Sequence, residues 1–329
     1  MNEANILHVS RLCVEFDTEA GRVRAVDGVG FQLKKGKTLG IAGESGCGKT
    51  ITALSIIRLL PKPVSRIVQG RVLFQGQDLP ALSKQEIQHI RGRKIAMIFQ
   101  EPMTALNSVH SIAKQVMEIH QIHFPGLSRD DMADASVNLL EKVGISDPGI
   151  VMKKYPHQLS GGMRQRVMIA MSLACRPDIL IADEPTTALD VTVQAEILDL
   201  IQKLKQESGM SVILITHDLG VIAENCDDVV VMYAGKIVEK ACVLDLFHHP
   251  LHPYTRGLLS SIPSRAQRPK TMLPTIPGHV PSLMEMPVGC RFQARCPLAA
   301  EICRQRAPEE RIMGQNHSVS CHMADEQGL

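Results

Sequence analysis

The sequence has no apolar run approaching the ~18–20 residues that a helix needs to span a bilayer. Its longest apolar runs, such as Val212–Ile215 and Val229–Tyr233, have the length of buried strands. The first residues, Met1–Leu7, lack both the basic region and the apolar stretch of a secretory signal. We therefore expect a cytosolic protein whose contact with any membrane depends on partner proteins.

A surplus of charge of either sign is also missing. Lys and Arg total 36 and Asp and Glu total 34, which leaves a net charge of +2. So small a charge does not by itself drive binding to nucleic acid. The 44% hydrophobic and 21% charged residues are ordinary for a soluble globular protein. Because 329 residues exceed one compact core, we expect a large domain and at least one smaller appendage.

The hydrophobic pattern predicts short alternating strands first and apolar strands separated by helices later. Alternation over Ile6–Phe16 and Val23–Leu33 predicts the early strands. The remaining predicted elements are strands at 39–43, 94–99, 179–182 and 212–215, helices at 49–60, 161–174 and 191–205, and helical periodicity over 107–145. Strands that alternate with helices favour an α/β fold with a parallel sheet covered on both faces.

The strand at 39–43 runs into a glycine-rich segment that matches the pattern G-x-x-x-x-G-K-[ST] in full. Glycines let backbone N–H groups approach phosphates closely, and the start of the following helix attracts negative charge. Lys49 is expected to neutralise the β- and γ-phosphates of ATP, and the Thr50 hydroxyl to bind Mg²⁺. The predicted ATP-binding residues here are Gly43, Glu44, Ser45, Gly46, Cys47, Gly48, Lys49 and Thr50.

Two carboxylates end the apolar segment Ile179–Glu184. Asp183 is expected to hold Mg²⁺ through water, and Glu184 to polarise the water that attacks the γ-phosphate. A strand end with two solvated acids would be as good an interpretation if the phosphate loop were absent.

The segment Leu159-Ser-Gly-Gly-Met-Arg-Gln-Arg166 resembles the signature of ABC-type ATPases, with Met163 where Gln is common. The resemblance implies that this signature closes on ATP held by a second subunit, so that hydrolysis requires a dimer. The residues expected to contact the partner's ATP are Ser160, Gly161, Gly162 and Gln165. The first three precede a predicted helix and so form a second anion-binding site.

Other segments match the same family in order over residues 5–260. Gln100 resembles the glutamine that contacts Mg²⁺ and senses the membrane partner, and Ala188-Leu-Asp190 resembles the D-loop. His217 resembles the switch histidine at the γ-phosphate. Phe16 resembles the aromatic residue that stacks on adenine, although a core role is as well supported.

The resemblance implies a P-loop NTPase (RecA-like) core with an antiparallel β subdomain and a helical subdomain. We place the ATPase domain at residues 1–250, with the helical subdomain at about 101–170. Its face near Gln100 and Pro102–Asn107 is expected to receive a helix of a transmembrane subunit. A solvated helical surface is the open alternative.

The last part of the chain, residues 251–329, begins with a stretch that carries six prolines between 263 and 289, which predicts a linker. The segments His252–Leu259, Pro277-Gly278 and Gly289–Pro297 resemble the C-terminal extension of oligopeptide/dipeptide permease ATPases. This resemblance narrows the family to importers of peptides, nickel and related solutes.

Four cysteines lie in this extension with the spacing C-x5-C-x6-C-x17-C, at Cys290, Cys296, Cys303 and Cys321. Disulfides are not expected in a cytosolic chain, and the close cysteine pairs of zinc sites are absent. Four thiolates can bind a [4Fe–4S] cluster, and the resemblance favours that cofactor. Zinc or unligated thiols remain alternatives.

We therefore expect an ATP-hydrolysing subunit of a bacterial-type ABC importer, with ATP and Mg²⁺ as ligands. The expected partners are a homologous second ATPase, two permease subunits and an extracytoplasmic solute-binding protein, at the cytoplasmic face of the inner membrane. Peptides are the favoured cargo, with nickel or another solute as the alternative. An ABC ATPase acting on nucleic acid or ribosomes is disfavoured by the near-neutral charge and the single ATPase unit, and a redox enzyme by the lack of a second cofactor motif.

Overall fold

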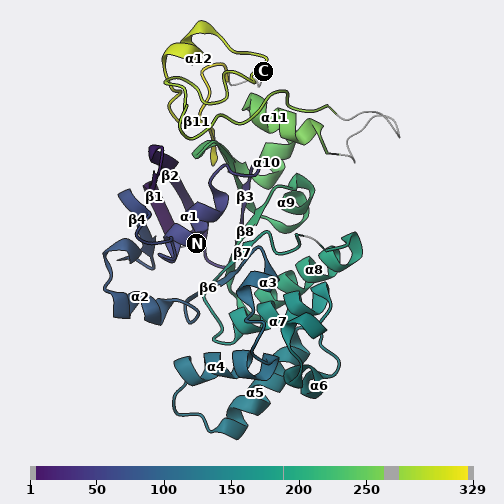
Figure 1. Cartoon of the computed structure of the whole chain (residues 1–329). Coiled ribbons are helices and arrows are strands. Elements are labelled where there is room, and N and C mark those ends of the chain that lie inside the picture. The colour runs from purple at the N-terminus through teal and green to yellow at the C-terminus, as the bar shows by residue number, and fades with distance from the viewer. Residues whose placement is uncertain (1–4, 188, 263–273, 325–329) are drawn as a thin grey trace. The chain divides into compact units, whose positions relative to one another are not determined.

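The computed structural model describes residues 5–187, 189–262 and 274–324 (Figure 1). The chain divides into two compact units. The first comprises Met1–Ala81 and Leu214–Leu329, and the second comprises Leu82–Ile213. Part of the proline-rich stretch, residues 263–273, lies outside the described residues.

The first unit begins with a four-stranded antiparallel sheet in the order β2-β1-β4-β5 (Figure 1). Its strands are β1 (Asn5–Thr18), β2 (Gly21–Lys34), β4 (Ser65–Phe74) and β5 (Gln77–Asp78). A tight turn joins β1 and β2, since Thr18 lies opposite Gly21. The alternation of buried and exposed residues in β2 gives the sheet one buried face, as the sequence pattern predicts.

A second set of strands in this unit surrounds β3 (Thr38–Ala42), which pairs in parallel with β9 (Asp228–Tyr233). The order continues antiparallel through β10 (Lys236–Cys242), β12 (His317–Val319) and β11 (Arg311–Gly314). The helices of this unit are α1 (Lys49–Ile56), α9 (Leu219–Asn225), α10 (Val243–His248), α11 (Pro253–Ser260) and α12 (Glu301–Gln305), with a 3₁₀ turn at Leu79–Ala81. The last two strands thus continue the sheet that begins at the phosphate loop.

Helix α1 is shorter than its sequence suggests. We predict a helix to Leu60, but α1 ends at Ile56. Two residues later, Arg58 has a φ of 54°, a left-handed conformation that ends regular helix.

Within the first unit, an aromatic cluster anchors the C-terminal extension to strand β9. Tyr233 of β9, Tyr254 of α11 and Phe292 pack together, with ring centroids 4.7–5.4 Å apart. Both tyrosine rings are almost fully buried. Edge-on aromatic contacts of this kind add stability beyond the buried area itself. The segment from Cys290 to Cys296, which contains Phe292, is therefore fixed to strand β9 and helix α11.

A buried polar group reinforces the same attachment. The Glu239 carboxylate of β10 accepts the backbone N–H groups of Leu251 and His252 and lies 2.9 Å from Nε2 of His317 in β12. His252 begins α11, since its Nδ1 accepts the N–H of Tyr254. Burial lowers the pKa of His252 to about 4, against the opposing effect of Glu239, so this imidazole stays neutral at pH 7.

The second unit contains two parallel strands, β6 (Ile95–Ile98) and β7 (Ile179–Asp183), and receives the beginning of β8 (Ser211–Thr216). Helices α4, α5, α6 and α7 pack on one another (Figure 1). The helices of this unit are α2 (Lys84–Ile90), α3 (Pro102–Ala105), α4 (Ile112–His123), α5 (Arg129–Lys142), α6 (Pro148–Lys153), α7 (Gly161–Leu173) and α8 (Val191–Ser208), with a 3₁₀ turn at Pro156–Gln158.

The helical periodicity predicted over residues 107–145 corresponds to α4 and α5, which are separated near Pro125-Gly126. Ser111 and Ser128 cap these helices by accepting N–H groups of their first turns. No helix in the described part of the chain is long and apolar enough to cross a membrane.

Candidate functional site

The phosphate loop connects β3 to α1 and depends on its glycines. Gly43, Gly46 and Gly48 have φ values of 149°, 78° and 101°, a region that favours glycine. A side chain at Gly43 would place its Cβ 2.3 Å from the carbonyl oxygen of Met232. The loop can therefore form only with the glycines that the motif contains.

The N-terminus of α1 is left available to a ligand. Gly48 is its N-cap, and no side chain among the described residues caps this end. Lys49 is 5% exposed, and its ammonium group donates to the carbonyl oxygens of Gly43 (2.8 Å) and Glu44 (3.1 Å). A helix N-terminus without a side-chain cap, together with a buried lysine, makes an anion-binding site suited to a polyphosphate. Thr50, the predicted Mg²⁺ ligand, is half-buried in the first turn of this helix.

Two residues of the C-terminal extension hold the same loop. The backbone N–H of Glu44 donates to the hydroxyl of Tyr254 at 2.9 Å. The Glu44 carboxylate accepts two hydrogen bonds from Arg295, at 2.6 and 2.9 Å. Hydrogen bonding to Glu44 raises the pKa of Arg295 above its ordinary value, so the guanidinium stays charged.

Cys47 contributes packing to the loop. Its side chain is fully buried, and its backbone carbonyl accepts the N–H of Gly235. Burial raises the pKa of the thiol, so it stays protonated at pH 7 and is a poor nucleophile.

Phe16 and His217 belong to the same unit as the phosphate loop. Phe16 is half-buried near the end of β1, opposite Val23 of β2 and Ser65 of β4. His217 is exposed directly after β8, and the following Asp218 caps α9 by accepting the N–H groups of Gly220 and Val221. The structure thus leaves both predicted contact residues at least partly accessible.

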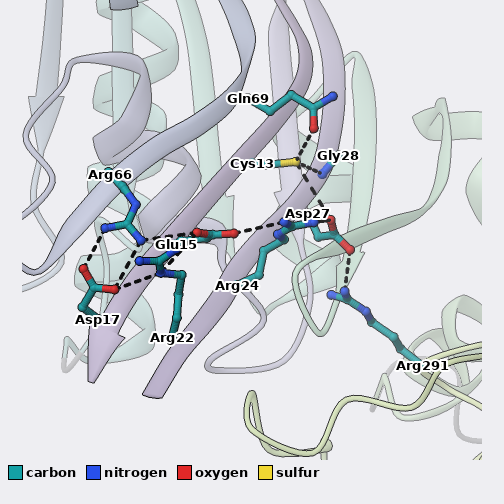
Figure 2. Close-up of polar contacts among 10 residues, drawn as sticks. All are labelled: Cys13, Glu15, Asp17, Arg22, Arg24, Asp27, Gly28, Arg66, Gln69 and Arg291. Atoms are coloured by element: carbon teal, nitrogen blue, oxygen red, sulfur yellow. Dashed lines mark hydrogen bonds and ion pairs between the residues drawn. The ribbon is translucent and has the colours of Figure 1, made fainter. Parts of the chain in front are cut away.

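The two sequence neighbours of Phe16, Glu15 and Asp17, take part in a network of ion pairs (Figure 2). This network was not predicted from the sequence. Asp17 accepts from Arg66 at 2.7 Å, and Glu15 accepts from Arg24 at 3.0 Å. These pairs tie β1 to its two neighbouring strands, β2 and β4. Because the side chains of Arg24, Arg66 and Asp17 are 39–48% exposed, water screens each pair, which contributes little stability by itself.

The network reaches the C-terminal extension through Asp27 (Figure 2). Its carboxylate lies 3.2 Å from Arg24 and 2.5 Å from Arg291. Although burial opposes the shift, Lys236 and Arg291 lower the pKa of Asp27 below its ordinary value. The Cys13 thiol also faces this carboxylate, at 3.9 Å.

In the second unit, the end of β7 carries the two predicted acids. Asp183 is 1% exposed, and Glu184 has a φ of 45°. The amide of Gln100 donates to Oε2 of Glu184 at 3.2 Å, and the Thr187 hydroxyl donates to the same oxygen at 2.9 Å. The structure therefore brings Gln100 and Glu184 together, as a site that orients water would require. A left-handed φ costs a non-glycine residue about 1–2 kcal/mol, and such strain is common at functional positions.

The signature segment begins α7. The Ser160 hydroxyl caps the helix by accepting the N–H of Met163 at 3.3 Å. Gly161 and Gly162 follow, and a Cβ at Gly162 would lie 2.9 Å from Val193, so the close approach of α8 requires glycine. Gln165, predicted to contact a partner's ATP, is 2% exposed and lies within α7.

The D-loop residue Asp190 has a structural role of its own. Its carboxylate accepts the N–H of Val193 at 3.0 Å and caps α8. Ala188, the first residue of the predicted D-loop, lies outside the described residues.

Two of the four C-terminal cysteines are in backbone contact, since the N–H of Cys290 donates to the carbonyl oxygen of Cys303 at 2.7 Å. Burial raises the pKa values of Cys290, Cys296 and Cys321, and the charges of neighbouring cysteines raise them further. The pKa of Cys290 rises to about 11. Among the described residues, however, no group of three or more His, Cys, Asp and Glu side chains is arranged to hold a metal ion. The predicted iron–sulfur site is therefore not preformed by these side chains.

Sequence reasoning missed the charged residues that connect the extension to the phosphate loop, Arg291 and Arg295. Both lie in the segment Gly289–Pro297, whose resemblance to the permease extension was the available signal. Their partners, Asp27 and Glu44, are 264 and 251 residues away in sequence. Ion pairs between residues so far apart leave no recognisable pattern in any short stretch of the sequence.

Family models match most of the chain. Residues 26–187 match the model described as ABC transporter, and residues 238–303 match the model described as oligopeptide/dipeptide transporter, C-terminal region. Residues 154–223 also match a model described as AAA domain, putative AbiEii toxin, Type IV TA system. The first two matches cover the phosphate loop and the segment that carries Arg295.

Named relatives match over nearly the whole length. The "Probable peptide ABC transporter ATP-binding protein y4tR" of Sinorhizobium fredii is 51% identical over 98% of this chain and 96% of its own. The dipeptide transport ATP-binding protein DppD of Bacillus subtilis is 49% identical over 98% and 95% of the two chains. DppD of Escherichia coli is 44% identical over 96% of each.

Solved structures match the fold. The dimeric structure of a post-hydrolysis state of the ATP-binding cassette MJ0796 bound to ADP and Pi has a TM-score of 0.65 and 26% identity, covering 72% of this chain and 98% of that one. A second neighbour is cbiO1 from Clostridium perfringens, part of the ABC transporter complex cbiONQ. It has a TM-score of 0.63 and 29% identity, covering 74% of this chain and 91% of that one.

Proposed function

Since the chain belongs to the ABC transporter family of ATP-binding proteins, in the branch with the oligopeptide/dipeptide C-terminal region, we propose that it energises the import of peptides or a related small solute. ATP hydrolysis is the activity of this family. The observation that carries the proposal for this chain is the phosphate loop. Its uncapped helix N-terminus and buried Lys49 form an anion-binding site on the described residues.

In the proposed reaction, the first unit binds the nucleotide. The N–H groups of the loop and of the α1 terminus receive the phosphates, and Lys49 exchanges its bonds to two carbonyl groups for bonds to the β- and γ-phosphates. The half-buried ring of Phe16 is proposed to stack on adenine, and the exposed His217 to contact the γ-phosphate.

The second unit is proposed to activate water. Glu184 polarises the attacking water while Gln100 and Thr187 fix its carboxylate through their hydrogen bonds. The oxygen atoms of Thr50, Gln100 and Asp183 are of the kind that Mg²⁺ prefers, which fits a role for these residues as its ligands. Bound Mg²⁺ neutralises charge on the phosphates. Ser160, Gly161 and Gly162, with Gln165 behind them in α7, are proposed to act on the ATP of a second subunit, and Asp190 to lie beside that contact.

The proposed assembly contains this chain, a homologous second ATPase and two permease subunits, served by an extracytoplasmic solute-binding protein. The chain would then lie at the cytoplasmic face of the inner membrane, attached through the permeases. Near-complete coverage of relatives named as peptide or dipeptide transport proteins supports this assignment.

Uptake of a radiolabelled dipeptide tests the proposal. Deleting the gene from its host should abolish ATP-dependent uptake, and restoring the native gene should recover it. An empty vector serves as the control. Normal dipeptide uptake in the deletion strain, accompanied by loss of nickel uptake, would show that the transported solute is nickel and not a peptide.

We further propose that the four C-terminal cysteines bind a [4Fe–4S] cluster as a structural centre. The N–H of Cys290 donates to the carbonyl oxygen of Cys303 at 2.7 Å, and neighbouring cysteines contribute to the raised pKa values of Cys290, Cys296 and Cys321, which supports their proximity. Thiolates are the ligands that iron–sulfur clusters require. A cluster would join α12 to the segments around Cys290 and Cys321, which have little regular secondary structure to hold them.

Metal analysis of protein purified without oxygen should find about four iron atoms and four acid-labile sulfides per chain, with broad visible absorption. Replacing Cys303 with Ser should remove both the iron and the absorption. The exposed surface near α12 offers a control, since Ile302→Ser changes a neighbouring side chain that is 43% exposed. Stoichiometric zinc without visible absorption would contradict the proposal.

A further inference from the structure

The strongest contact of the C-terminal extension with the phosphate loop is the pair of Arg295 and Glu44. Its two hydrogen bonds, 2.6 and 2.9 Å long, join both ends of the guanidinium fork to the two carboxylate oxygens. The Arg295 side chain is 5% exposed and that of Glu44 is 29% exposed. The pair is therefore much better shielded from water than an ordinary surface ion pair.

The position of Arg295 is fixed independently of Glu44. Its Nε donates to the carbonyl oxygen of Pro277 at 2.9 Å, and Nη2 donates to that of Ile276 at 3.3 Å. The guanidinium carbon lies 5.7 Å from the ring centroid of Tyr233 and 6.0 Å from that of Phe292. Because these contacts restrain Arg295 on several sides, Glu44 is the more adjustable partner.

Glu44 is held through its backbone as well. Its N–H donates to the buried hydroxyl of Tyr254, and its carbonyl oxygen accepts from Lys49. The residue thus lies between the extension and the lysine that is proposed to bind phosphate. Any displacement of Glu44 changes the position of the groups that receive the nucleotide.

A second arginine attaches the same short segment to the unit. Arg291 contacts the carboxylate of Asp27 (Figure 2). It also donates to the backbone carbonyl of Ala234. Arg291 follows Cys290, and Arg295 precedes Cys296. The segment between these two cysteines is therefore anchored at both ends by arginines.

We propose that Arg295 is a positioning residue for ATP binding, which holds Glu44 and neutralises its charge so that the phosphate loop can accept a triphosphate. The inference rests on the proposed function of that loop. A carboxylate beside a polyphosphate repels it, and the bidentate pair with Arg295 removes that repulsion. ATP affinity in this chain thereby depends on the extension that follows the ATPase core.

Replacing Arg295 with Met keeps most of the side-chain volume and removes the charge. In the purified full-length protein, Arg295→Met should raise the Kd for ATP about tenfold, the scale of one charge-assisted pair. The measurements are isothermal titration calorimetry with ATP and steady-state ATPase kinetics. KM should rise with Kd, while kcat stays within about twofold, because Arg295 contacts no reacting atom.

Removing both charges provides the decisive comparison. The double variant Arg295→Met with Glu44→Gln should return the Kd to within about threefold of the native value, since no uncompensated carboxylate remains. Arg295→Lys, which keeps the charge without the fork, should give an intermediate Kd and serves if the Met variant does not fold. The control is Arg304→Met, because Arg304 is 72% exposed and pairs only loosely with Glu301, at 3.9 Å.

The outcomes separate the inference from the proposed function. A native Kd in Arg295→Met, while Lys49→Ala weakens ATP binding by roughly 100-fold, would overturn the inference alone. A fall in kcat at unchanged KM, with no recovery in the double variant, would show a merely structural role and also overturn it. If Lys49→Ala bound ATP normally, the proposed function of the loop would fail first.

Discussion

Replacing Glu184 with Gln is expected to lower the kcat for ATP hydrolysis by about 100-fold or more, the usual contribution of a general base. The amide cannot take a proton from water, but it has nearly the same shape as the carboxylate. The Gln100 amide and the Thr187 hydroxyl both donate to Oε2 of Glu184, and an amide oxygen at that position can accept both. ATP binding should therefore stay within about threefold of the native value.

The measurement is phosphate release under saturating ATP, together with calorimetric titration of ATP. Glu207→Gln is a matched control in the same unit, because Glu207 is 55% exposed and its contact with Lys203 is 4.0 Å long. That variant should hydrolyse ATP at the native rate. Unchanged turnover in Glu184→Gln would remove Glu184 from the mechanism.

Replacing Lys49 with Ala is expected to weaken ATP binding by roughly 100-fold. A hydrogen bond from a charged donor contributes about 1.5–3 kcal/mol, and two such bonds to phosphates account for about 3 kcal/mol or more. The Lys49 ammonium already lies in the loop, where it bonds to two carbonyl oxygens, so little rearrangement separates the free from the bound state. The loss should therefore appear mainly in the Kd.

Calorimetric titration with ATP again gives the Kd, and circular dichroism checks that the variant folds. Lys35→Ala removes an exposed lysine that precedes β3 in the same unit, and it should bind ATP as the native chain does. Equal affinities for the two variants would exclude the phosphate loop as the ATP site.

Local sequence patterns were sufficient to predict the helices and strands that carry the motifs. The alternation in β1 and β2, the apolar runs of β6, β7 and β8, and the long helices α7 and α8 lie where the sequence predicts them. Helix α1 is shorter than predicted, because its end depends on the backbone conformation at Arg58. The short strands β11 and β12 were not predicted, since β12 pairs with residues of β10 about 80 positions away and β11 joins the sheet only through β12.

At the phosphate loop, the sequence determines the class of ligand and the tertiary structure determines the residues that surround it. The motif from Gly43 to Thr50 by itself determined the ligand class, because only glycines permit its backbone conformation and Lys49 supplies the charge. The signature at Leu159–Arg166 determined the family in the same way. Both motifs are local, because the residues that are proposed to bind ATP in each of them are neighbours in the sequence.

Only the tertiary structure decided what surrounds that loop. It placed Arg295 and Tyr254 against Glu44, brought the Gln100 amide to Glu184, and joined the backbones of Cys290 and Cys303, although the described side chains form no group arranged to hold a metal ion. These contacts join segments up to 251 residues apart. Their geometry depends on packing and burial, which no run of neighbouring residues encodes.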